Sequence, residues 1–126
     1  MMQKNYLESL KLMSKKFAKE NKIFDIILYG STTKGKEGGR DVDILIVFED
    51  LNLKKRLDIS QCFKGNIKKI VKNPDVKTIN LKEFFDKNFL ARQNILIEGI
   101  SLIDDLPISS RLVFEGFSIF TYNLKN

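Results

Sequence analysis

Apolar and polar residues alternate along the chain with two different periods, and the changes of period divide it into predicted elements. Over residues 3–21, apolar side chains recur at steps of three and four, which predicts an amphipathic helix. The runs 23–29 and 41–48 are short, apolar and rich in β-branched residues, and they predict strands. Residues 31–40 between these runs predict a turn-like connection.

The remaining chain predicts further helices and strands in alternation. Helical spacing of apolar residues covers 52–72, although Gly65 and Asn66 weaken the middle of this predicted helix. After it, the pattern predicts a segment over 73–81 that opens with a turn and continues as a strand, and then a helix over 81–100 with Gly99 as its stop. A short strand over 100–103 and a strand-like, aromatic tail over 111–124 follow. The resulting order, α-β-turn-β-α-β-α-β, predicts an α/β or α+β domain with a small mixed sheet flanked by helices.

Length and composition fit one domain and remove several kinds of chemistry. The 126 residues are 43% apolar, which suits a single core, with 24–48 as the central motif and 100–126 as a strand-rich extension. The chain has no histidine, so an imidazole base and histidine-ligated zinc are excluded. Its one cysteine, Cys62, allows no internal disulfide, which fits a reducing cytoplasm. No apolar run is long enough to predict a transmembrane helix or a signal peptide.

The net charge of +6 comes mostly from lysines in two stretches, 4–22 and 54–72. A basic balance favours polyanionic partners, including nucleotide phosphates and nucleic acid. The alternative is that the lysines only solvate the surface, because they are spread along the chain rather than packed into one block.

The stretch from Leu28 to Phe48, LYGSTTKGKEGGRDVDILIVF, begins almost like a phosphate-binding P-loop. Gly30, four further residues, then Gly35 and Lys36 fit the first part of that motif, but Glu37 stands where a serine or threonine should hold magnesium. The acids that follow stand at the start of their strand, whereas the partner aspartate of a P-loop lies at the end of a later strand. The glycines and lysines therefore need another explanation.

Gly30 and Ser31 are predicted to form a turn at the end of a strand. Glycine lets the backbone turn tightly, and backbone N–H groups at such a turn bind a phosphate readily. The Ser31 hydroxyl adds one donor, and Lys34 or Lys36 adds charge. The alternative is an ordinary helix N-cap that follows the strand.

Asp41 and Asp43 stand two residues apart at the head of the second predicted strand. Residues i and i+2 of a strand point to the same face, so we expect the two carboxylates to lie side by side. Because like charges repel, a divalent cation relieves the pair, and Mg²⁺ favours carboxylates together with phosphate oxygens. The alternative is an exposed pair at the edge of a strand. On this predicted strand, the face opposite the two carboxylates is lined by Val42, Ile44, Ile46 and Phe48. The carboxylate face continues with Leu45 and Val47.

Taken together, the phosphate-binding turn and the carboxylate pair resemble the nucleotidyltransferase superfamily that includes DNA polymerase beta. The family pattern is an apolar strand, Gly-Ser, a short loop often with a further glycine, and Asp-x-Asp entering a second strand. Its positions are matched here by Gly30, Ser31, Gly35, Asp41 and Asp43. The order of elements around the motif also matches, so the resemblance covers at least residues 3–85. The size is that of the small, single-domain members.

The resemblance implies a metal-dependent transfer of a nucleoside monophosphate from a nucleoside triphosphate. The triphosphate would be gripped at Gly30 and Ser31, within a nucleotide-binding loop that includes Lys34 and Gly35. One or two Mg²⁺ ions would be held by Asp41 and Asp43, which would be catalytic. An acceptor hydroxyl would attack the α-phosphate and release pyrophosphate.

The family usually has a third carboxylate, on the strand after the next helix. The place that matches it here holds Lys77. Asp75 lies two residues earlier on the same face and is the candidate for this catalytic role, although it also fits an exposed turn residue after Pro74. Without a third carboxylate, the chain would be a catalytically weak or inactive module that binds nucleotide or RNA.

The sequence leaves the acceptor of the nucleotide open among RNA, a protein and a small molecule. The small members that it resembles include antitoxins that modify a separately encoded helical toxin. The resemblance therefore implies a helical partner protein of this kind as one candidate acceptor.

Overall fold

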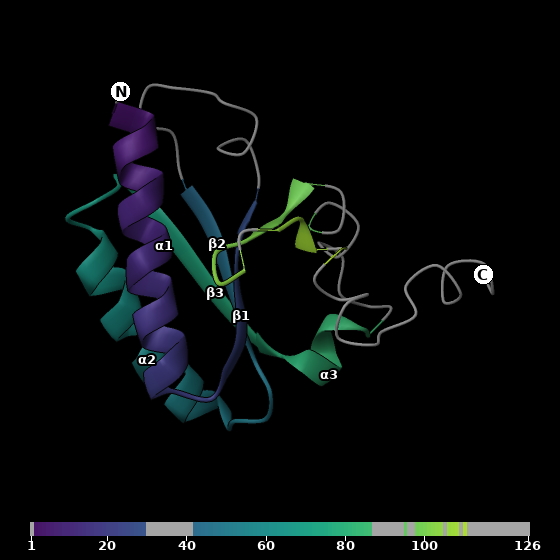
Figure 1. Ribbon diagram of the computed structural model, residues 1–126. Helices are drawn as coiled ribbons and strands as arrows, with labels where there is room; N and C mark the ends of the chain where they lie inside the picture. The colour runs from purple at the N-terminus through teal and green to yellow at the C-terminus, as the bar shows by residue number, and fades with distance from the viewer. Residues whose placement is uncertain are drawn as a thin grey trace.

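The computed structural model describes residues 2–29, 42–86, 95, 98–104, 106–108 and 110 of the chain, with side chains from Tyr6 onward. The predicted turn and the predicted site residues within 30–41 lie outside these ranges, as does the predicted strand-like tail over 111–124. The described elements are α1 (Met2–Glu20), β1 (Ile23–Tyr29), β2 (Val42–Phe48), α2 (Leu53–Ile67), β3 (Pro74–Asn80), α3 (Leu81–Phe84) and β4 (Ile100–Ser101), and Figure 1 shows their arrangement. Their order is the predicted one.

The four strands form one mixed sheet in the order β3-β2-β1-β4. β1 pairs antiparallel with both β2 and β4, and β2 pairs parallel with β3. The helix α2 makes the crossover between the two parallel strands, as a parallel pair requires. The predicted α+β fold, a small mixed sheet flanked by helices, is therefore confirmed.

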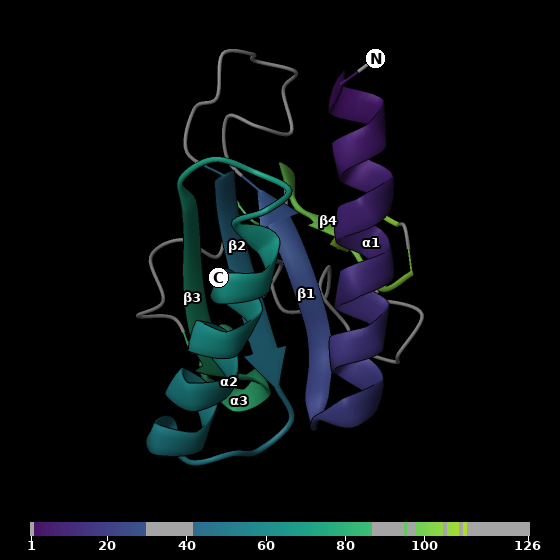
Figure 2. The same cartoon turned by 90° about the vertical axis from the view of Figure 1, so that its left-hand side faces the viewer.

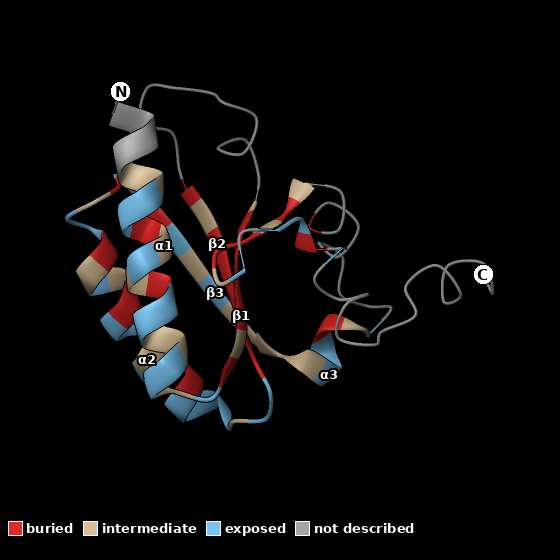
Figure 3. Ribbon diagram, in the orientation of Figure 1, coloured by how far each residue is buried: buried red, intermediate tan, exposed pale blue. Residues whose placement is uncertain are grey.

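Both long helices lie on one face of the sheet, which Figure 2 views from the helix side. The apolar side of α1, including Leu10 and Phe17, packs there against residues such as Ile44 and Phe48 of β2. Phe17 and Phe63 join the two helices through an edge-to-face contact, with ring centroids 5.1 Å apart. Figure 3 shows buried residues along the strands and on the helix sides that face them, and exposed residues on the outer sides. No described helix combines the length and the apolar character needed to cross a membrane.

The opposite face of the sheet carries a second apolar cluster. Ile27, Leu45 and Val47 pack there with Phe84 of α3 and with Ile95. Alternate residues of β2 thus enter different clusters, as the period of two in this strand predicts. This second face also carries Asp43, because Asp43 is in phase with Leu45 and Val47.

The predicted helix over 52–72 is too long, since α2 ends at Ile67. Beyond it, the N–H groups of Ile70 and Val71 both donate to the Ile67 carbonyl, at 2.8 and 2.9 Å, and so form a turn. Asn73 then takes a positive φ of 46°, which helices do not contain. Pro74 begins the next strand, so the six residues 68–73 form the connection to β3.

The predicted helix over 81–100 is wrong in its first part, because α3 ends at Phe84. Phe85 is half-buried and packs on the same apolar cluster as Phe84, and the two rings meet edge to face at 5.4 Å. Adjacent residues of a continuous helix point about 100° apart, so the break lets both rings reach one cluster. The predicted stop at Gly99 and the short strand after it are confirmed by β4.

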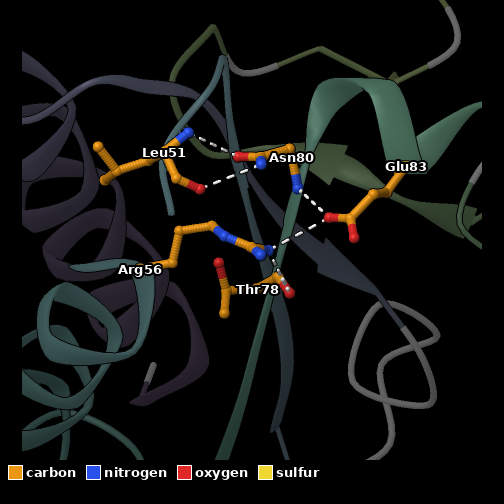
Figure 4. A network of polar contacts seen from close by, with 5 residues as sticks. All are labelled: Leu51, Arg56, Thr78, Asn80 and Glu83. Carbon is orange, nitrogen blue, oxygen red and sulfur yellow. Dashed lines mark hydrogen bonds and ion pairs between the residues drawn. The ribbon is translucent and has the colours of Figure 1, made fainter. Parts of the chain in front are cut away.

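A polar network holds the start of α3 against α2 and the segment that follows β2, as Figure 4 shows. The carboxylate of Glu83 accepts from the Asn80 N–H at 2.7 Å and from the Arg56 guanidinium at 3.2 Å. The Asn80 amide exchanges two hydrogen bonds with the backbone of Leu51, at 3.0 and 3.1 Å. The network fixes the end of β3 opposite to the one that carries Asp75.

Candidate active site

Three strands bring Tyr29, Asp43 and Asp75 into one row across the sheet. Tyr29 is the register partner of Asp43 in the antiparallel pair, and Asp43 is the partner of Asp75 in the parallel pair. β1 ends here, while β2 and β3 begin here, at the upper end of the sheet in Figure 2. Register partners point to the same face, and neighbouring strands lie about 4.8 Å apart. Two of the predicted site residues, Asp43 and Asp75, are therefore neighbours.

Asp75 belongs to the strand rather than to the turn before it. It is the second residue of β3, and its side chain is 49% exposed. Its carboxylate pairs with the ammonium of Lys77, with Nζ 3.7 Å from Oδ2. Lys77 is in phase with Asp75 on the same strand, and it is the register partner of Leu45. The cation at position 77 thus lies one row further from the end of the sheet than the two acids.

Sequence reasoning missed Tyr29, which completes the row on the other side of Asp43. Its pKa is raised from 10.0 to about 12, first by burial and then by the negative charges of Asp43 and Asp75. The two carboxylates that disfavour a tyrosinate favour a cation by the same electrostatic effect. The signal in the sequence was the position of Tyr29 at the end of a strand that pairs antiparallel with the one beginning near Asp43.

The other predicted site residues lie outside the described residues. They are Gly30, Ser31, Lys34, Gly35 and Asp41, all in the connection between β1 and β2. The described ends of this connection, Tyr29 and Val42, both lie at the site end of the sheet. The Val42 N–H donates to the Asn73 carbonyl at 3.3 Å, so the start of β2 is tied to the turn that precedes β3.

The described donor set suits a cation that completes its coordination from other sources. Within the described ranges, no group of three or more acidic, cysteine or histidine side chains could hold a metal ion by itself. Asp43 and Asp75 supply two neighbouring carboxylates. Mg²⁺ usually takes one or two carboxylates together with water and substrate phosphates. These residues fit Mg²⁺ bound together with a nucleotide.

Solved structures with the same fold support this placement of the elements. A toxin–antitoxin structure with AMP-PNP is 18% identical to this chain, with a TM-score of 0.57 over 89% of this chain and 87% of the other. A tri-AMPylated HEPN toxin of Shewanella oneidensis in complex with MNT antitoxin gives 18% identity and a TM-score of 0.56, over 96% and 87%. A candidate nucleotidyltransferase from Sulfolobus solfataricus gives 19% and 0.52, over 79% and 81%. At these identities the likeness shows the fold.

Comparison at the level of sequence gives the family. None of the curated proteins is similar enough to this chain to count as a match. A family model described as the nucleotidyltransferase domain matches residues 10–102, which is more than half of the chain and includes all four described strands. The chain therefore belongs to the nucleotidyltransferase domain family.

Proposed function

We propose that this protein transfers a nucleoside monophosphate from a nucleoside triphosphate to a hydroxyl group of a separately encoded partner protein, and that the transfer depends on a divalent cation. The observation that carries the proposal is the register pair Asp43–Asp75 at the end of the sheet. Family membership supports the transferase reaction in general terms. The cation, the acceptor and the roles of the individual residues are the proposed part.

In the proposed reaction, the acceptor oxygen forms a bond to the α-phosphorus. The bond from that phosphorus to the oxygen bridging the α- and β-phosphates breaks, and pyrophosphate leaves with the electron pair. The hydroxyl proton passes to the half-exposed carboxylate of Asp75 or, through it, to water. Asp43, Asp75 and the predicted ligand Asp41 would hold Mg²⁺, which would offset the negative charge of the phosphates.

The choice of a protein acceptor rests on the kind of proteins that share this fold. One such structure contains an AMPylated HEPN toxin with its MNT antitoxin, so in that pair the nucleotide is found on the partner protein. Other structures with this fold are also toxin–antitoxin pairs. RNA is the other macromolecular acceptor class, which the experiment below separates from protein.

A second candidate function is a binding module that holds nucleotide and transfers it slowly or not at all. The observation in its favour is the ion pair between Lys77 and Asp75, at 3.7 Å. A cation fixed beside one of the two described carboxylates lowers the attraction of the site for Mg²⁺. The same pair is half-exposed, so solvent weakens it and nucleotide-bound Mg²⁺ can compete with it.

The test uses ATP labelled either at the α-phosphate or at the γ-phosphate, incubated with the protein, Mg²⁺ and cell extract. We expect only the α-label to become fixed to a macromolecule, in a form sensitive to protease. Asp43→Asn should abolish the labelling, whereas Asp58→Asn should leave it unchanged, because Asp58 is exposed on α2, where it pairs with Lys54 at 3.9 Å.

Any other labelling result would favour a different reaction, acceptor or function. Fixation of the γ-label would indicate a kinase and overturn the proposal. A product sensitive to nuclease would make RNA the acceptor. Bound nucleotide without any fixed label would favour the binding module.

A further inference from the structure

A groove lies beside the site end of the sheet, between the last turn of α2 and the start of β3. Its volume is about 610 Å³, and Lys64, Lys68 and Lys72 line it together with Asp75. We call this the basic groove, defined by its three lysines. Asp75 thus belongs both to the groove and to the row of residues that contains Asp43.

The backbone brings the three lysines together. Lys64 and Lys68 are four residues apart at the end of α2, which places them about 6 Å apart along the helix on one side. The turn that follows, in which the Val71 N–H donates to the Ile67 carbonyl at 2.9 Å, returns Lys72 to the same groove. The carbonyl of Asn73 accepts from Val42, so the groove is held at a fixed place beside the start of β2.

The charge of the groove is not neutralised by neighbouring acids. Lys68 and Lys72 are exposed and Lys64 is half-buried, and none of the three makes an ion pair with a described residue. The acid at the groove, Asp75, is paired with Lys77 instead. Three unpaired cations around one concave surface attract an anionic ligand by their combined field.

The composition of the groove distinguishes between kinds of anion. Single-stranded nucleic acid is usually held by aromatic side chains that stack on the bases, and arginine adds planar contacts to phosphates and bases. Among the described residues that line the groove there is neither an aromatic side chain nor an arginine, and the apolar ones are Val71 and Pro74. Flexible lysine ammonium groups suit the separate carboxylates of a peptide.

We propose that the basic groove binds an acidic segment of the partner protein and so brings the neighbouring acceptor hydroxyl to the carboxylates at the end of the sheet. The inference rests on the proposed function for the identity of the occupant. The continuity of the groove with Asp75 is what links binding to chemistry, since a segment held by Lys68 and Lys72 lies next to the residue proposed to take the proton.

The experiment measures binding alone, so that its result is separate from the outcome of the labelling experiment. The probe is a fluorescent helical peptide with glutamate at every fourth position, titrated with the protein and followed by anisotropy. The test variant is Lys68→Glu with Lys72→Glu. The matched control is Lys15→Glu with Lys19→Glu, two exposed residues at the same spacing in the C-terminal half of α1. That half of α1 leads to the lower end of the sheet in Figure 2, whereas β3 begins at the upper end. Either pair of substitutions lowers the net charge of the protein from +6 to +2.

We expect the test variant to bind the peptide about tenfold more weakly at low salt, with the control changing less than about twofold. Equal losses in both variants would mean that only net charge matters and would overturn the proposal. A uridine oligonucleotide that binds at Lys68 and Lys72 more tightly than the peptide would overturn it in favour of RNA. A matching loss of affinity for ATP would assign the groove to the nucleotide instead, and no peptide binding by the parent protein would also overturn it.

Discussion

The transferase and the binding module assign different importance to Lys77, which pairs with Asp75. The substitution Lys77→Met tests how far this lysine weakens Mg²⁺ binding at the site. Methionine keeps the length of the side chain and removes its charge. The ammonium lies 3.7 Å from the Asp75 carboxylate, and the two side chains are 64% and 49% exposed. If the pair restrains Asp75, its removal should leave that carboxylate freer to bind a cation.

The structure sets the size of this effect. Two unit charges 3.7 Å apart attract each other by about 1 kcal/mol in water. Measured exposed pairs contribute between about 0.2 and 1 kcal/mol, so Lys77→Met should raise Mg²⁺ affinity between about 1.5-fold and fivefold. The free energy of unfolding should fall by less than about 1 kcal/mol, because the pair is exposed.

The assay is a calorimetric titration of Mg²⁺ into protein saturated with a non-hydrolysable ATP analogue. Lys15→Met is the control, since it removes the same charge from an exposed position on α1. The difference between the two variants should shrink as salt is added. Unchanged Mg²⁺ affinity in Lys77→Met would refute the idea that Lys77 competes with Mg²⁺ for the Asp75 carboxylate. A loss of affinity for the nucleotide analogue would show instead that Lys77 contacts the phosphates.

Two further substitutions test the packing and the electrostatics. Gly99→Ala should lower the free energy of unfolding by about 1–3 kcal/mol in urea denaturation, because its Cβ would press on the Ile95 carbonyl and lie 2.9 Å from Ile27 Cγ2. Gly65→Ala should raise the free energy of unfolding by about 0.5–1 kcal/mol, since nothing lies within 4 Å of the added Cβ on α2. Equal changes in the free energy of unfolding for Gly99→Ala and Gly65→Ala would contradict the packing argument. For Tyr29, the pKa of about 12 in the folded state exceeds the ordinary 10.0, so stability should fall as the pH rises from 10 towards 12. Tyr29→Phe should lose this part of the pH dependence, and equal slopes in the two proteins would contradict the raised pKa.

The strands could be predicted from the sequence because their signal is local. Short β-branched runs bounded by polar residues mark β1 and β2, and their alternation assigns each residue to a face. The ends of α2 and α3 could not be predicted in the same way. α3 ends early because Phe84 and Phe85 pack on one cluster, and that cluster also contains residues distant in sequence, such as Ile27 and Leu45. A local pattern does not contain those contacts.

Asp25 shows the same limit for a polar residue. It stands in an apolar run and is fully buried, which nothing near it in the sequence explains. Its Oδ1 accepts from the Ser101 hydroxyl at 2.7 Å and from the Ile26 N–H at 2.8 Å. Ser101 in turn accepts from the N–H groups of Ile103 and Asp104, at 3.2 and 3.0 Å. The carboxylate therefore anchors the turn after β4 to β1, a role that only the paired strands reveal.

The candidate site was predicted in its parts, but the relation between Asp43 and Asp75 depends on register. The family resemblance assigns position 77 to the third carboxylate, and the sheet pairs that position with Leu45, one row away from the acids. Two residues along a strand span about 6.6 Å, so a side chain at 75 starts closer to Asp43 than one at 77. An aspartate displaced by two positions stays on the same face and moves towards the end of the sheet where β1 ends and β2 begins. On this geometry, the lysine at position 77 does not by itself abolish the proposed chemistry. Asp75 can take the place of the third carboxylate, because it lies closer to Asp43 than position 77 does.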